Sequence, residues 1–139
     1  MRRHPFRFAM ADATKPHVSS LQALIGAIAL ARALKTHWQG QQNVGRRRPP
    51  TVAGALTTGA ATLAGRTCVN LNYTVGKAGL ESAVRQAHLR TIVTSRKFIE
   101  KAKLELPEGP TILWLEDIGA TIGTREKITA AALALLAPL

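Results

Sequence analysis

The feature of this sequence that most constrains its fold is the alternation of short β-prone runs with segments of helical period. Three such runs lie in the second half of the chain: "TCVNLNY" at residues 67–73, "RTIVTS" at 90–95 and "TILWLEDI" at 111–118. Helix-forming segments lie between them, at 76–89 and 96–106. Strands that alternate with helices form right-handed crossover units, in which successive strands run parallel. The alternation therefore predicts an α/β fold with a mostly parallel sheet and flanking helices.

Two further helices are predicted in the first half of the chain. One begins at a capping box, in which the side chains of Ser19 and Gln22 satisfy free backbone amides, and it runs to about Trp38. The other begins near Pro50, which suits a first helical turn, and ends at Gly65. The remaining expected elements are short strands at residues 6–12 and 17–20 and a last helix at 125–139.

Length and composition limit the interior of the protein. A chain of 139 residues has the usual size of one domain and, if complete, can bury roughly two thirds of its unfolded surface. Apolar residues make up 46% of the sequence but aromatic residues only 4%, so the core must consist mainly of Ala, Leu, Ile and Val. No internal repeat or low-complexity linker divides the sequence. Residues 1–139 are therefore predicted to form a single α/β domain.

The charge balance favours contacts with anions but does not specify a partner. The chain has 19 Lys and Arg against 8 Asp and Glu, a net charge of +11, which attracts phosphate-rich surfaces whatever the fold. The basic residues are scattered and no aromatic residue is interleaved with them, so no specific nucleic-acid site is predicted. Weak association with polyanions or anionic membranes is the expected consequence.

Cysteine content and hydropathy bear on the cellular compartment. Cys68 is the only cysteine, which rules out an intrachain disulfide and fits a reducing compartment. The N-terminus lacks the unbroken apolar run of a secretory signal, and the longest apolar stretch, residues 21–34, is too short for a membrane span. The chain is therefore expected to be cytoplasmic.

A search for catalytic motifs finds none. The sequence has no G-x-x-x-x-G-K-[ST] phosphate loop, no G-x-G-x-x-G dinucleotide motif and no G-x-S-x-G nucleophile elbow. The histidines lack the spacing of a metal-binding helix, so no metal ligand is predicted. Glu116 and Asp117 adjoin at the expected end of a strand, where neighbouring side chains point to opposite faces. A loop or capping role is expected for both, and no catalytic or cofactor-binding residue is predicted.

Several segments resemble the start of the AMP-binding, adenylate-forming enzymes, a family that includes the acyl-CoA and acyl-ACP synthetases. They are "FAMAD" at 8–12, "LNYT" at 71–74, "IVTSRKF" at 92–98 and "LEDI" at 115–118. The likeness covers roughly residues 4–139 and is nearest to the synthetase half of bifunctional 2-acylglycerophosphoethanolamine acyltransferase/acyl-ACP synthetases. It implies fatty acyl activation in phospholipid acyl recycling: ATP and a fatty acid give an acyl-adenylate, which passes to a carrier thiol. It also implies that the parent enzyme associates with the inner membrane.

The same resemblance implies that this chain is not catalytic by itself. The family's ATP loop with its Lys, the Asp that holds the ribose and the C-terminal Lys have no counterpart in these 139 residues. ATP and Mg²⁺ are therefore expected only in the complete parent enzyme, and the remainder of the synthetase domain is the expected partner. The chain corresponds to an incomplete, N-terminal fragment, which in the family packs beside the ATP site and shapes one side of the acyl pocket.

The segment "NVGRRRPPTVAGAL", residues 43–56, departs from the family pattern. Where the family has an apolar strand buried on both faces, this chain has Arg46, Arg47 and Arg48 in succession. Burying one unpaired guanidinium costs several kcal/mol, and three would exceed the roughly 5–15 kcal/mol of stability of a domain. Either the strand lies at a sheet edge with its arginines in water, or the fold is compromised there. An altered strand is preferred over an evolved anion site.

Two functions remain open. The first is a non-catalytic N-terminal piece of a fatty acyl-activating enzyme. The second is a basic interaction module that binds nucleic acid or anionic lipid, with Arg46, Arg47 and Arg48 as candidate anion contacts. A downstream reading frame that encodes the ATP loop and the catalytic lysine would favour the first.

Overall fold

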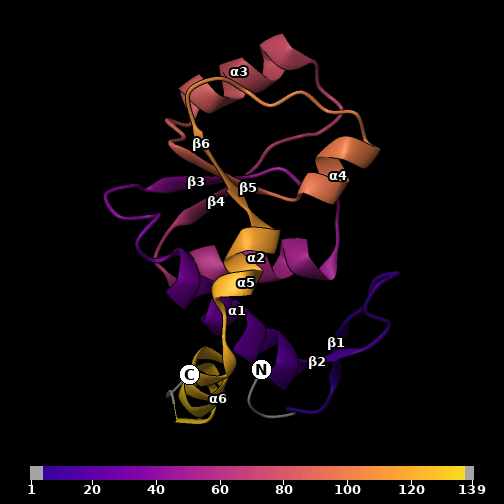
Figure 1. Cartoon of the computed structure of the whole chain (residues 1–139), viewed down its shortest axis with the longest axis vertical. Helices are drawn as coiled ribbons and strands as arrows, with labels where there is room; N and C mark the ends of the chain where they lie inside the picture. The colour runs from indigo at the N-terminus through magenta and orange to yellow at the C-terminus, as the bar shows by residue number, and fades with distance from the viewer. Residues whose placement is uncertain (1–4, 137–139) are drawn as a thin grey trace.

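The computed structural model describes residues 5–136 and has the predicted α/β architecture, with helices on both faces of a parallel sheet (Figure 1). The sheet in this part of the chain has four strands in the order β4-β3-β5-β6. They are β3 (Asn43–Arg46), β4 (Thr67–Asn70), β5 (Thr91–Thr94) and β6 (Thr111–Trp114). Each neighbouring pair runs parallel, as the alternation of strands and helices predicts.

Strand β3, which ends in the first of the three arginines, is an inner strand of this sheet. It pairs with β4 from Asn43 opposite Thr67 to Arg46 opposite Asn70, and it pairs with β5 on its other side. The strand is closely packed, because a Cβ added at Gly45 would lie 2.9 Å from a side-chain carbon of Ile92. The alternative of an edge strand with its arginines in water is therefore wrong.

Two helices cover one face of the sheet and a third covers the other. Helices α1 (Ser20–Leu34) and α2 (Val52–Leu63) pack against each other, and α3 (Lys77–Gln86) lies on the opposite side (Figure 1). The buried core beneath α1 and α2 includes Leu34, Trp38, Val44, Ala60, Ala61 and Val93. The core beneath α3 consists of Leu71, Leu80, Val84, Leu89 and Ile92. Apart from Trp38, both cores are aliphatic, as the composition predicts.

The remaining elements lie around this central unit. Strands β1 (Phe8–Met10) and β2 (Val18–Ser19) pair antiparallel in a small separate sheet that contacts the start of α1. Helix α4 (Arg96–Lys101) follows β5. Helices α5 (Leu115–Thr121) and α6 (Thr124–Leu136) follow β6, and α6 packs against α1 (Figure 1). No helix among residues 5–136 has the length and apolar character that a membrane crossing requires.

Local signals in the sequence predict the helix starts well. The capping box of α1 is present: the Gln22 amide donates to Ser19 Oγ at 3.3 Å, and the Ser19 amide donates to Gln22 Oε1 at 2.9 Å. Ser95 caps α4 through Phe98, as expected from its position. Pro50, however, precedes α2, which begins at Val52 after the N-cap Thr51.

Several predicted elements are shorter in the structure. Helix α1 ends at Leu34 instead of Trp38, whose indole turns into the core. Helix α4 ends at Lys101 because the chain takes a positive φ of 49° at Lys103. The predicted strand at 111–118 ends at Trp114, and its second half forms α5. The last three residues of the predicted C-terminal helix, 137–139, lie outside the described residues.

Candidate functional site

The carboxyl ends of the parallel strands gather most of the charged residues that the sequence singles out. Arg46, Arg47 and Arg48 end and follow β3, Ser95 and Arg96 follow β5, and Glu116 and Asp117 follow β6. Ligands of open α/β sheets bind at this edge, outside the carboxyl ends of the strands. The strand ends are therefore the candidate functional site.

The first two arginines point to opposite faces of the sheet, as successive residues of an extended chain do. Arg46 lies toward α2, where a Cβ added at Gly54 would be only 2.6 Å from Arg46 Nη1. The absence of a side chain at Gly54 thus makes room for the guanidinium. Arg47 lies on the other face, where its Nη1 donates to the carbonyl of Glu105.

Arg47 is almost fully buried, with 2% of its surface exposed. Its backbone continues the sheet, because its amide donates to the Val93 carbonyl at 3.0 Å and its carbonyl accepts from Thr94 Oγ1 at 2.8 Å. Burial lowers the pKa of the guanidinium, and its Nε has no hydrogen-bond partner among the described residues. Arg47 therefore holds the loop that carries Glu105 and is inaccessible to a macromolecular anion.

Arg48 lies in a mixed-charge environment. Burial lowers its pKa, the charges of Glu116 and Asp12 oppose this shift, and the charge of Arg46 adds to it. Arg48 and Lys15 line a small cavity of about 210 Å³ together with Asp12. A carboxylate within the cavity weakens its attraction for an anion, so Arg48 is not part of a purely cationic surface.

Asp12 connects the N-terminal loop to the start of α2. Its carboxylate accepts hydrogen bonds from the Thr14 hydroxyl at 2.7 Å, from the Val52 amide at 2.8 Å and from the Lys15 amide at 2.8 Å. These bonds, led by that of Thr14, hold the pKa of Asp12 well below its usual range. The short sequence around Asp12 is typical of an Asx turn, but no local pattern predicts the bond to Val52, forty residues away.

Glu116 and Asp117 both bind the N-terminus of α4. Glu116 accepts from Ser95 Oγ at 2.6 Å and from the Arg96 amide at 3.3 Å, while Asp117 accepts both guanidinium amino groups of Arg96 at 2.7 Å. The expectation that the side chains of Glu116 and Asp117 point to opposite faces of a strand was wrong, because both residues lie in the first turn of the helix α5. The first turn of a helix favours acidic side chains. The expected capping role of Glu116 is confirmed.

The pKa shifts in this group follow from its hydrogen bonds. Burial raises the pKa of Glu116, but the bond from Ser95 and those from backbone amides outweigh it and leave the pKa lowered. The Arg96 guanidinium lowers the pKa of Asp117, and Asp117 raises that of Arg96, which also lies 4.8 Å from the centroid of the Trp114 ring. These carboxylates are ionised and satisfied, so the group stabilises the strand ends and presents no free general base.

The described part of the chain offers no other obvious catalytic chemistry. Among residues 5–136, no group of three or more His, Cys, Asp and Glu side chains could hold a metal ion. Cys68 is half-buried, and its thiol lies 3.8 Å from the hydroxyl of Thr58. The structure thus places the three arginines in different environments, only Arg48 being influenced by the charges of Asp12 and Glu116, and among the described residues it assembles no nucleophile with a base at this edge.

No protein-family model matches the chain, but its fold matches solved structures. The N-terminal subdomain of NpsA from Klebsiella oxytoca, in complex with 3-hydroxybenzoyl-AMSN, superposes with a TM-score of 0.74 at 12% identity, over 90% of this chain and 30% of that one. VinN superposes with a TM-score of 0.74 at 16% identity, over 91% and 33%. A benzoate CoA ligase from Burkholderia xenovorans LB400 gives 0.67 at 18% identity, over 88% and 27%.

These matches establish the fold. The chain has the architecture of the N-terminal subdomain of adenylate-forming enzymes and spans about a third or less of the length of these three solved structures.

Proposed function

We propose that this chain serves as the non-catalytic N-terminal part of an acyl-activating, adenylate-forming enzyme and acts only together with the ATP-binding remainder. The observation that carries the proposal is the subdomain fold, which accounts for 88–91% of this chain but only 27–33% of the three matched structures. The parent enzyme would convert ATP and an acid into an acyl-adenylate and pass the acyl group to a carrier thiol. ATP and Mg²⁺ would bind only in the complete parent enzyme.

The finer part of the proposal concerns the acid and the thiol. The segments "LNYT", "IVTSRKF" and "LEDI" favour a fatty acid as the substrate and an acyl carrier protein or CoA as the acceptor, in the recycling of phospholipid acyl groups. This part rests on the sequence resemblance, whereas the activation of an acid rests on the fold as well.

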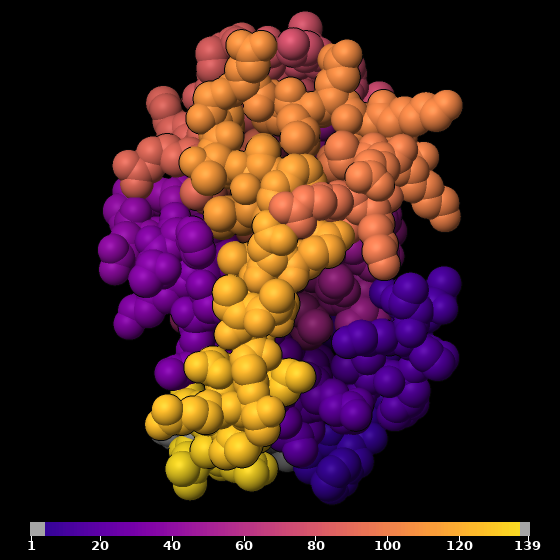
Figure 2. Space-filling model, viewed as in Figure 1, coloured from indigo at the N-terminus to yellow at the C-terminus, as the bar shows by residue number. Residues whose placement is uncertain are grey.

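An apolar face of α6 supports association with a larger body. Ala130 and Ala134, one turn apart, are buried in the contact with α1, whereas Ile128 and Leu135 point the other way and are 64% and 59% exposed. The α5–α6 segment, coloured yellow, forms a ridge along one face of the molecule (Figure 2). Large apolar side chains exposed together are typical of an interaction surface, and we infer that this face of α6 contacts the remainder.

The experiment is reconstitution of activity. The chain alone is expected to show no fatty-acid-dependent ATP/pyrophosphate exchange. Added to an adenylate-forming synthetase from which the matching N-terminal subdomain has been deleted, it is expected to bind in gel filtration and to restore exchange. Exchange by the chain alone would contradict the non-catalytic role, and failure of both binding and restoration would contradict the proposal as a whole.

Matched variants test the α6 face. Ile128→Ser with Leu135→Ser is expected to abolish binding while leaving the circular dichroism of the chain unchanged, since both side chains are exposed. Arg125→Ser with Lys127→Ser changes two exposed polar residues of the same helix and is expected to bind normally. Equal loss of binding in both double variants would show that α6 does not provide a specific apolar contact.

The alternative of a basic interaction module receives less support from the geometry. Arg47 is buried, and Arg46 and Arg48 are half-buried among Gly54, Asp12 and Glu116. Of the three candidate anion contacts, none presents a fully exposed guanidinium.

A further inference from the structure

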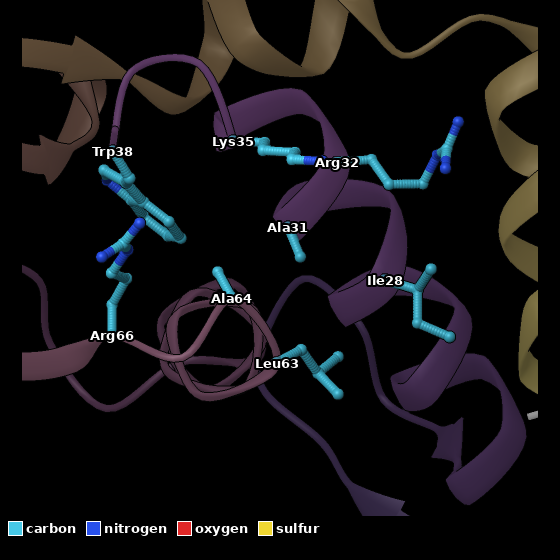
Figure 3. Close-up of a pocket in the computed structure, with 8 residues that line it drawn as sticks. All are labelled: Ile28, Ala31, Arg32, Lys35, Trp38, Leu63, Ala64 and Arg66. Carbon is cyan, nitrogen blue, oxygen red and sulfur yellow. The ribbon is translucent and has the colours of Figure 1, made fainter. Parts of the chain in front are cut away.

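A second cavity lies at the opposite edge of the sheet, near the amino ends of the strands. Its walls are the last turns of α1, which leads into β3, and of α2, which leads into β4. Its volume is about 410 Å³, within the range of small-molecule sites. Figure 3 shows its lining side chains extending from the two helices and from the turn after α2.

The lining divides into an apolar part and a cationic part. Ile28, Ala31, Leu63 and Ala64 supply the apolar part. Arg32 and Lys35 from α1 supply a cationic part on one side, Arg66 from the turn after α2 lies beside Trp38 on the other, and the lining found among residues 5–136 contains no acidic side chain (Figure 3). The cavity therefore has the two chemical surfaces that an amphiphile with an anionic head requires.

None of the three cations forms a salt bridge with a carboxylate among residues 5–136. The salt bridges among the described residues join Lys77 to Glu108 and Arg96 to Asp117, and neither involves this cavity. Arg66 is fixed by a bond from its Nη1 to the Gln41 carbonyl at 2.5 Å, and its buried Nε has no partner in the described part of the chain. Arg66 is therefore engaged beside Trp38, and the exposed Arg32 and Lys35 of α1 supply the unneutralised positive field that a bound anion would face.

Trp38 provides a spectroscopic reporter for the cavity. It also lines the cavity, only 1% of its surface is exposed, and its indole Nε1 has no hydrogen-bond partner among residues 5–136. Because the indole N–H is buried, it is not itself a contact for a ligand, but the ring lies in the cavity wall and its fluorescence can report occupancy.

We propose that this cavity binds a single-chain amphiphile whose phosphate or carboxylate head contacts Arg32 and Lys35 and whose apolar body lies against Ile28 and Leu63. The site is distinct from the strand ends described above, and its occupancy requires neither ATP nor the remainder of an enzyme. Its test therefore succeeds or fails independently of the proposed function.

The test is a calorimetric titration of the whole chain with decyl phosphate, kept below the concentration at which decyl phosphate forms micelles. The Trp114→Phe variant leaves Trp38 as the only tryptophan, so its fluorescence reports the cavity. We expect saturable binding of one ligand per chain with a change in Trp38 emission. Inorganic phosphate, which lacks the tail, and decyl maltoside, which lacks the charge, are each expected to bind at least tenfold more weakly.

Variants locate the ligand. Arg32→Gln with Lys35→Gln removes two exposed cations of the cavity and is expected to weaken decyl phosphate binding at least tenfold. Lys97→Gln with Lys101→Gln removes the same charge from exposed positions on α4 and is expected to leave affinity within twofold. Leu63→Glu, at a residue 49% exposed, adds a carboxylate to the lining and is expected to abolish binding.

Three results would overturn the proposal. They are an absence of saturable binding by monomeric decyl phosphate, an equal loss of affinity in the two double variants, and inorganic phosphate binding as tightly as decyl phosphate. Binding only to vesicles that contain phosphatidate, without binding of the monomer, would also overturn it, because general attraction to a charged surface would then suffice.

Discussion

Replacement of Arg47 by methionine should stabilise the protein, because Arg47 is a buried cation without a carboxylate partner among residues 5–136. Only 2% of Arg47 is exposed, one bond joins its side chain to the Glu105 carbonyl, and its Nε has no partner among the described residues. Methionine is unbranched and flexible, so it can follow the path of the aliphatic part of the arginine without a charge.

The magnitude follows from three contributions. Removing a buried charge recovers a desolvation cost of several kcal/mol. Losing a hydrogen bond from a charged group costs about 1.5–3 kcal/mol, and burying an apolar side chain of this size contributes about 1.5–3 kcal/mol. The last two contributions roughly cancel, so the free energy of unfolding should rise by about 1–4 kcal/mol, the range found when buried ion pairs are replaced by apolar residues.

Urea denaturation followed by far-ultraviolet circular dichroism measures this difference, provided that the slope with denaturant is unchanged. Arg85→Met, at an exposed position of α3, is the matched control and should change the free energy by less than about 0.5 kcal/mol. Arg47→Ala should be less stable than Arg47→Met, since it leaves a void beneath the loop that carries Glu105. A methionine variant less stable than wild type by more than about 1 kcal/mol would refute the reasoning, because the arginine would then contribute more through its contacts than burial of its charge costs.

Three further perturbations test other contacts. Asp12→Ala should lower the melting temperature at neutral pH. Because the folded pKa of Asp12 is depressed, the difference in melting temperature from wild type should shrink as pH falls below about 4. A difference that does not change with pH would contradict the role of the carboxylate. Gly54→Ala should destabilise the protein, because the added methyl group contacts Arg46 Nη1 and the Pro49 carbonyl. In a double-mutant cycle, adding Arg46→Ser should recover part of the stability that Gly54→Ala loses. Additive effects of the two substitutions would place the clash elsewhere. With a net charge of +11, the chain should bind DNA weakly and without sequence preference in gel-shift titrations, and binding that persists at high salt would instead indicate a specific site.

Local signals in the sequence predict most of the elements, whereas contacts between distant segments are not visible there. The capping box of Ser19 and Gln22 spans four residues, so its chemistry can be read directly and is present in the structure. The start of α5 was missed because "TILWLEDI" is apolar enough to continue as a strand, although the acidic pair Glu116 and Asp117 is equally typical of a first helical turn.

The arginine triplet shows where sequence reasoning fails physically. If the three arginines are treated as three unpaired buried charges, their burial cost argues against an inner strand. The structure instead places the three side chains in different environments. Gly54 makes room for Arg46, and a backbone carbonyl from a loop 58 residues away accepts from Arg47. The first contact lies within residues 43–56 and the second outside them, but neither can be predicted from the segment, because both depend on how helices and loops pack over the sheet.

The pairing of β3 with β5 has a consequence for the dynamics of the molecule. Two residue pairs join these strands, Gly45 with Ile92 and Arg46 with Val93, whereas four pairs join β3 to β4 and four join β5 to β6. The bonds of the Arg47 backbone to Val93 and Thr94 lengthen this short seam by one residue. We therefore expect partial opening of the sheet to separate β4-β3 from β5-β6 at a lower free energy than it divides either pair, and we expect the amide of Arg47 to exchange its hydrogen with solvent through that opening.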